Sequence, residues 1–261
     1  MTTLLEIVCK KRIRYEDKTR ELKGFLGENN EILINKKLFK SALSIKDAVD
    51  IRKKMVYLIL HHCIKHYSAM SEEGKILSFH DVMNILDKAV HQLATPEYFY
   101  RLINFRDQSG NTLLHQAVIS NNTDAIEALL KYGASPLIKN KEEKIPLDLD
   151  QEEKTREALI KSMKDQAQSK KESARCNGLI GIIPGVFLGI GLGVGSALVP
   201  SMTIILCTLA VSALVAGIAV GVAIYFLSQD YKQAKSIEEA VNPQLSFVKH
   251  EKTVDNKAVL G

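Results

Sequence analysis

Residues 107–140 read DQSGNTLLHQAVISNNTDAIEALLKYGASPLIKN, and their pattern sets the architecture of the chain around them. The spacing of apolar residues predicts a turn at 107–110, a short helix at 113–120 and a second helix at 124–132. Gly133 follows the second helix and suits the left-handed position at which many helices end. Because so small a helix pair cannot bury its own apolar faces, the pattern predicts stacked neighbours, as in a repeat protein.

The same stretch resembles an ankyrin repeat. The family pattern D-x-x-G-x-T-P-L-H-x-A, followed later by L-L-x-x-G-A, is matched by Asp107, Gly110, Thr112, Leu114, His115, Ala117, Leu129, Leu130, Gly133 and Ala134. Leu113 departs from the proline of the family, a mild change at a position that only starts the helix. The resemblance implies that His115 is structural and bonds across neighbouring turns.

A second, altered repeat follows at a period of 33 residues. This period carries Asp107 onto Asn140 and the Leu113–Leu114 pair onto Pro146–Leu147. Asp148 and Asp150 replace the histidine and the alanine, and an outer helix is expected at 156–163. Polar residues at positions that would face a next repeat are typical of a capping unit, so we expect 106–165 to contain the whole array.

The residues before the repeats are predicted to be helical. Apolar stripes at 79–93 and 45–63, and a capped start at Thr95-Pro96, predict three helices. We interpret 41–105 as a helical cap or as degenerate repeats. Residues 1–40 are uncertain, with a β-hairpin around 28–30 as one candidate.

The second half of the chain contains GIIPGVFLGIGLGVGSA at 181–197. Its glycines do not have the G-x-G-x-x-G spacing of a dinucleotide loop, and its apolar residues do not suit a solvated linker. Residues 178–227 are uncharged, too many for one membrane crossing, and Pro200 is the natural break. We therefore expect a transmembrane hairpin of two helices, at 179–197 and 203–227.

Charges flanking the hairpin predict its orientation. Lys and Arg residues lie on both outer sides and none lies in the turn, so both termini are expected in the cytoplasm. A polar linker is expected at 166–177 and a mobile cytosolic tail at 228–261. Small residues spaced four apart predict the faces along which the helices meet, within one chain or in a homo-oligomer. These residues are Gly181, Gly185, Gly189, Gly193, Ala213, Gly217 and Gly221.

Composition excludes several functional classes. The net charge of +5 is spread along the chain, so no nucleic-acid partner is expected. The four cysteines lie far apart and are interpreted as free thiols in a reducing compartment. HHCIKH at 61–66 lacks further ligands for a metal site, and its side chains are expected to be partly exposed. No metal, cofactor or catalytic residue is expected, and the chain is predicted not to be an enzyme.

The predicted fold is mostly α: a short ankyrin-type array with a helical N-terminal cap, followed by a two-helix transmembrane hairpin. The resemblance implies a scaffold that binds a protein partner through its turns and inner helices. The corresponding residues are Arg106, Gln108, Ser109, Asn111 and Gln116. The chain is similar to ankyrin proteins of intracellular bacteria, some of which act on host proteins. The alternative is a membrane-active protein whose glycine-rich hairpin oligomerises to permeabilise or remodel a bilayer.

Overall fold

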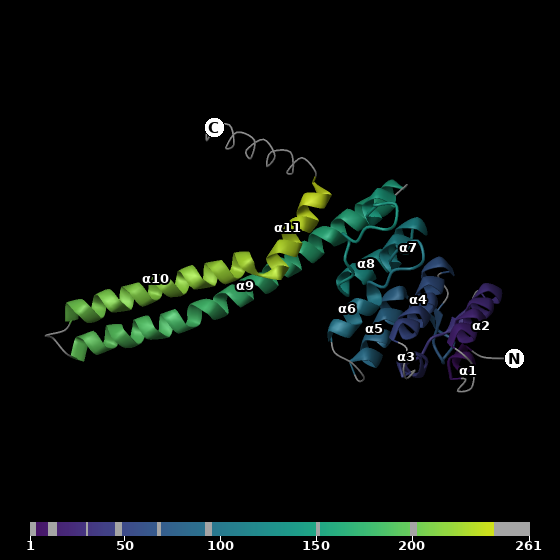
Figure 1. Cartoon of the computed structure of the whole chain (residues 1–261), viewed down its shortest axis with the longest axis horizontal. Helices are drawn as coiled ribbons and strands as arrows, with labels where there is room; N and C mark the ends of the chain where they lie inside the picture. The colour runs from purple at the N-terminus through teal and green to yellow at the C-terminus, as the bar shows by residue number, and fades with distance from the viewer. Residues whose placement is uncertain are drawn as a thin grey trace. The chain divides into compact units, whose positions relative to one another are not determined.

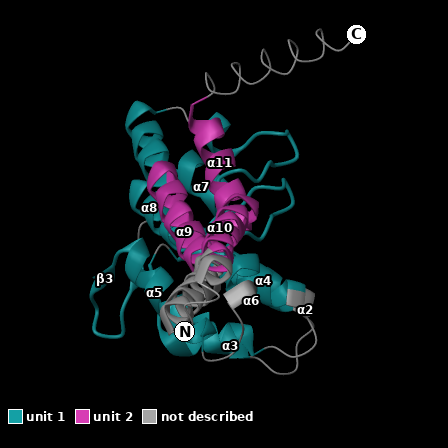
Figure 2. Ribbon diagram, turned by 90° about the vertical axis from the view of Figure 1, so that its left-hand side faces the viewer, with its two compact units in different colours: residues 1–162 teal, residues 163–261 magenta. Residues whose placement is uncertain are grey.

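The computed structural model of this chain is mostly helical and divides into two compact units, residues 1–162 and 163–261 (Figure 2). It describes residues 4–9, 15–29, 31–44, 49–66, 69–91, 96–149, 152–198 and 203–242. The surroundings of side chains are described for these ranges except at 15–16, 49, 96–97, 180–198 and 203–207.

The first unit begins with helices that form most of its core (Figure 1). They are α1 (Leu4–Cys9), α2 (Tyr15–Glu28), α3 (Lys36–Leu43), α4 (Val49–His66), α5 (Phe79–Val90) and α6 (Pro96–Ile103). Ser78 starts α5 with a capping box, since its hydroxyl accepts from the Asp81 N–H while the Asp81 carboxylate accepts from the Ser78 N–H. The predicted stripe of α5 is buried, from Phe79 to Val90.

A small sheet joins segments that are distant in sequence. Strand β2 (Ala69–Met70) pairs in parallel with β1 (Ile32–Leu33) and antiparallel with β3 (Ile76–Leu77). The β-hairpin considered around residues 28–30 is wrong. Helix α2 continues to Glu28, and β1 takes its partner from the segment after α4.

The repeat region follows its sequence pattern closely. Helix α7 (Leu113–Ile119) and helix α8 (Thr123–Lys131) form the predicted pair, and Gly133 has a φ of +89°. Asn122, only 1% exposed, caps α8 by accepting from the Ala125 N–H. Its amide nitrogen donates to the Ile64 carbonyl of α4 at 2.9 Å, and Asp124 accepts from the Phe79 N–H at 2.7 Å. The repeat is therefore hydrogen-bonded to the helices that precede it.

The altered second repeat consists of the 3-10 helix η1 (Pro146–Leu149) and the start of α9 (Glu153–Leu198). The outer helix expected at 156–163 is the first part of α9, where Leu159 and Met163 are buried. Asp150 lies outside the described residues. Residues 166–177, predicted as a polar linker, are helical because α9 continues through them.

The second unit consists of the later part of α9 together with α10 (Thr203–Leu227) and α11 (Gln229–Val241). Helix α10 has the bounds expected for the second apolar helix and runs beside α9 (Figure 1). The start of the tail predicted to be mobile is helical, because α11 is capped by Ser228. Pro200 and residues 243–261 lie outside the described residues.

One stretch of the described chain, Thr208–Leu227, is long and apolar enough to cross a membrane, with a mean hydropathy of 2.3. Of the residues predicted to pack the hairpin, Gly217 and Gly221 are buried and Ala213 is half-buried. Gly221 lies against Gly178 of α9, so small residues lie at this one contact between the two helices. Gly181, Gly185, Gly189 and Gly193 are helical, but their surroundings lie outside the described part.

Candidate partner-binding surface

The turn that starts the ankyrin-like segment is organised around one carboxylate. Asp107 Oδ1 accepts from the backbone N–H of Ser109 at 2.8 Å and of Asn111 at 2.9 Å. Its Oδ2 accepts from the Tyr57 hydroxyl at 3.0 Å and from the Gln116 amide at 3.1 Å. Asp107 therefore fixes the turn and ties it to both α4 and α7.

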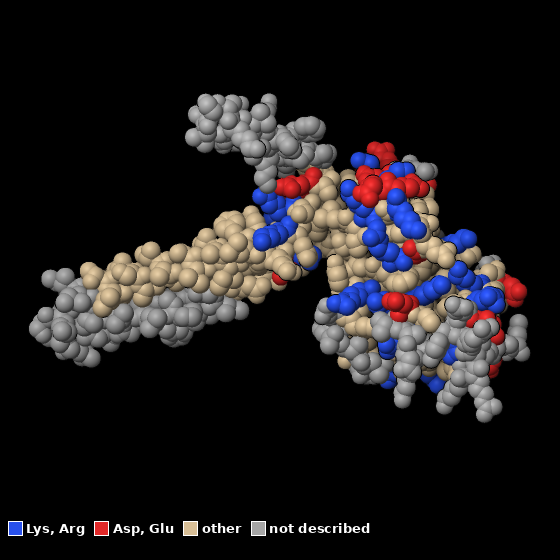
Figure 3. Space-filling model, viewed as in Figure 1, with Lys and Arg blue, Asp and Glu red and all other residues tan. Residues whose placement is uncertain are grey.

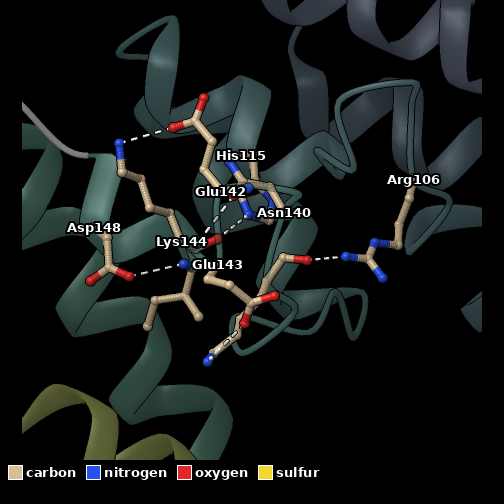
Figure 4. Close-up of polar contacts among 9 residues, drawn as sticks. Arg106, His115, Asn140, Glu142, Glu143, Lys144 and Asp148 are labelled. Atoms are coloured by element: carbon tan, nitrogen blue, oxygen red, sulfur yellow. Dashed lines mark hydrogen bonds and ion pairs between the residues drawn. The ribbon is translucent and has the colours of Figure 1, made fainter.

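The turn one period later repeats the two hydrogen bonds from backbone N–H groups. Asn140 Oδ1 accepts from the Glu142 N–H at 2.9 Å and from the Lys144 N–H at 3.1 Å (Figure 4). The left-handed position is occupied by Gly110 in the first turn, with φ +79°, and by Glu143 in the second, with φ +61°. The expected second repeat is thus present in the geometry of its turn.

His115 connects the two turns and is fully buried. Its Nε2 lies 3.1 Å from the Lys144 carbonyl, which can only accept, so Nε2 carries the hydrogen. Its Nδ1 accepts from the Thr112 N–H at 3.1 Å. Burial lowers the pKa of His115, which keeps the imidazole neutral. These bonds confirm the structural role implied for His115, and Asp148 takes the equivalent place by accepting from the Ile145 N–H at 2.9 Å.

A pocket of about 460 Å³ opens where the first turn meets α2 and α4. It is lined by Lys23, Lys54, Tyr57, Leu58, His61, Phe105, Arg106, Asp107, Gln108 and Ser109. Tyr57 and Phe105 form an aromatic wall, with ring centroids 5.6 Å apart. Figure 3 shows Lys and Arg side chains spread over the visible face of this unit.

Positively charged side chains outnumber negatively charged ones in the lining of the pocket. The Asp107 carboxylate is saturated by its four hydrogen bonds, whereas Lys23 and Lys54 form no ion pair with any described residue. Arg106 donates to the carbonyls of Gly110 and Lys139 and has no carboxylate partner in the described chain. Burial, followed by the charge of Asp107, raises the pKa of Tyr57, so its hydroxyl stays protonated and donates. The pocket is therefore a cationic recess with an aromatic wall.

The structure brings together part of the predicted binding set. Arg106, Gln108 and Ser109 line the pocket, while Gln116 binds Asp107 behind it. Asn111 faces the second turn and accepts from the Asn140 amide at 3.0 Å. Sequence reasoning missed the pocket residues of α2 and α4, Lys23, Lys54 and Tyr57. Tyr57 lies 50 positions before Asp107, and no local pattern joins the two.

The histidine segment of α4 is more buried than expected. His62 is 5% exposed and Cys63 is 4% exposed, so the expectation of partly exposed side chains is wrong for both. The rings of His62 and His66 lie with their centroids 4.5 Å apart. Burial raises the pKa of the Cys63 thiol to about 12, which keeps it protonated and unreactive. Within the described ranges, no three His, Cys, Asp or Glu side chains are grouped to hold a metal ion.

Comparison with known families supports the assignment of the repeat. Residues 109–141 match the family model described as ankyrin repeat. Comparisons with curated proteins and with solved structures give no match. The match begins within the first turn, covers α7 and α8, and ends in the second turn.

Proposed function

We propose that this ankyrin-repeat chain is a protein-binding adaptor held at a membrane, and that its partner presents an acidic group to the pocket at the first turn. The ankyrin repeat supports a role in protein–protein interaction. The observation that carries the proposal is the recess that Lys23, Lys54 and Arg106 line together with an aromatic wall.

The pocket favours a carboxylate-bearing protein segment over an apolar one. Two lysines without carboxylate partners among the described residues leave positive charge at its rim. Charge complementarity of this kind raises the rate of association and selects against basic partners. Gln108 and Ser109 are exposed at the same rim and supply polar contacts. The role is binding without catalysis.

The second part of the proposal is the membrane anchor. The apolar stretch Thr208–Leu227 supports one crossing. The uncharged residues at the end of α9 supply the second crossing, which completes a hairpin. The flanking Lys and Arg residues favour the cytoplasmic side for both termini of the hairpin. A partner from a host cell is proposed only because the chain is similar to ankyrin proteins of intracellular bacteria. Identification of the labelled partner tests this part of the proposal.

The full-length chain, fused to a proximity-labelling enzyme, tests the binding role. The double variant Lys23→Glu/Lys54→Glu reverses the charge of the pocket and is expected to remove the labelled partner. Lys88→Glu/Lys161→Glu changes two exposed lysines outside the pocket by the same charge and serves as the matched control. Loss of the partner in both variants, or in neither, would contradict recognition through this pocket.

Carbonate extraction of membranes that contain the same full-length chain tests the anchor separately. An integral hairpin stays in the membrane pellet, because its apolar surface cannot be transferred to water at alkaline pH. Recovery of the chain in the soluble fraction would reject the anchor and leave the binding role to stand on the labelling result.

A further inference from the structure

A second groove lies within unit 163–261, between the charged part of α9 and the end of α10. Its volume is about 360 Å³. It is lined by Arg175, Gly178, Leu179, Gly221, Val222, Tyr225 and Phe226. Nothing in the proposed binding role uses this groove, because the partner pocket is in the other unit.

The floor of the groove is backbone. A Cβ atom at Gly178 would lie 3.0 Å from the Gly221 carbonyl oxygen and 3.1 Å from Tyr225 Cβ, so a larger residue at 178 would force the two helices apart. The walls are apolar and open: Leu179 is 61% exposed, Val222 47% and Phe226 52%. Apolar walls of this extent are unfavourable in water and suit hydrocarbon.

One end of the groove carries a free cation. The neighbouring lysines bind side chains of α11. Lys170 Nζ donates to Gln233 Oε1 at 2.7 Å, and Lys171 Nζ donates to Glu238 Oε1 at 2.5 Å. Arg175 is exposed and makes no ion pair or hydrogen bond with a described side chain. Arg175 is also the last charged residue before the uncharged run, so its guanidinium lies at the boundary between the charged and apolar segments.

Aromatic side chains mark the same boundary. Tyr225 and Tyr231 have ring centroids 4.8 Å apart, and Phe226 and Tyr231 have centroids 5.1 Å apart. Tyrosines of membrane proteins gather at the level of the lipid headgroups. Figure 3 shows an uncharged visible surface along α10 that gives way to Lys and Arg beside α11. The groove therefore spans from headgroup level towards hydrocarbon.

We propose that this groove binds one anionic phospholipid, with its phosphodiester on Arg175 and an acyl chain along Leu179, Val222 and Phe226. A guanidinium binds phosphate oxygens through paired hydrogen bonds, and basic pockets between membrane helices bind lipid headgroups on the cytoplasmic side. A soluble anion would use the cation and leave the apolar walls in water. This assignment rests on the membrane anchor proposed above.

The test is native mass spectrometry of the full-length chain in detergent, titrated with phosphatidylglycerol or with phosphatidylcholine. The wild-type chain is expected to retain phosphatidylglycerol preferentially, and Arg175→Gln to weaken its retention about tenfold through loss of the charged contact. Gly178→Leu, which fills the floor, is expected to weaken retention of both lipids. Lys232→Gln removes an exposed cation that does not line the groove and is expected to change nothing.

Two outcomes would overturn the site. The first is equal retention of phosphatidylglycerol by the wild-type chain and Arg175→Gln. The second is competition by inorganic phosphate, which would indicate a site for a soluble anion. Carbonate extraction of the wild-type chain and of Arg175→Gln separates failure of the lipid site from failure of the membrane anchor. Both chains in the membrane pellet without a lipid preference reject the groove alone, whereas the wild-type chain in the soluble fraction rejects the anchor and the groove with it.

Discussion

In the turns at 107–111 and 140–144 the first side chain accepts the same two hydrogen bonds from backbone N–H groups, but the residues differ. A charged Asp107 organises the first and a neutral Asn140 the second. Gly110 occupies the left-handed position of the first, where the second has Glu143. The comparison shows that the side-chain oxygen at the first position defines the turn, while the residue at the left-handed position is determined by what packs against it. Only the first turn is crowded there.

The largest effect is expected from Gly110→Ala. A Cβ atom at this position would lie 2.8 Å from the Lys141 nitrogen, and its φ of +79° strains any other residue. Left-handed strain of ~1–2 kcal/mol adds to a steric cost of similar size, so we expect a loss of about 3 kcal/mol in stability. Urea unfolding of the full-length chain, followed by hydrogen exchange in α7, measures it. Glu143→Ala is the matched control and should change stability by less than about 0.5 kcal/mol; a similar loss in both variants would break the distinction between the turns.

A smaller effect is expected from removal of the organising oxygen. Asp107→Ala breaks bonds to two backbone N–H groups and leaves the Tyr57 hydroxyl and the Gln116 amide without this acceptor. We expect a loss of about 2 kcal/mol, against about 1 kcal/mol for Asn140→Ala, since bonds to a charged acceptor are stronger. The same unfolding assay measures both. Asp107→Asn isolates the charge, and equal losses for the two alanine variants would show that the links to α4 and α7 contribute nothing.

The smallest effect on stability is expected from a change of pH. Because the pKa of His115 is lowered in the folded chain, the unfolded chain binds more protons as the pH falls below about 6.5, and the stability of the repeat decreases. Above that pH the contribution is fully present. His61, whose pKa burial also lowers, acts in the same direction, so His115→Gln should flatten the pH dependence only in part. An unaltered slope in His115→Gln would contradict the assigned role of His115.

Sequence periodicity predicted the elements whose stabilising contacts are local. The bounds of α7, α8 and α10 and the conformation of Gly133 follow from apolar spacing, composition and one C-cap. Contacts between distant segments were not predictable. Strands of two residues carry no alternation, which is why the β1–β2 pairing was missed.

The candidate site shows the same limit. The sequence of the first turn predicted Arg106, Gln108 and Ser109, but the residues on the opposite wall of the pocket belong to α2 and α4. A pocket that forms only where separate elements pack together cannot be predicted from the sequence of either element alone. The burial of His62 in α4 escaped prediction for the same reason.

The amide of Asn122 has a consequence for how the first unit unfolds. It caps α8 with one atom and binds the last turn of α4 with another, while Asp124 binds the start of α5. An array of repeats can fray from one end, because each member contacts only its neighbours. These bonds instead couple the repeat to two earlier helices, so α4, α5 and α8 are expected to exchange their amide protons in a single cooperative opening.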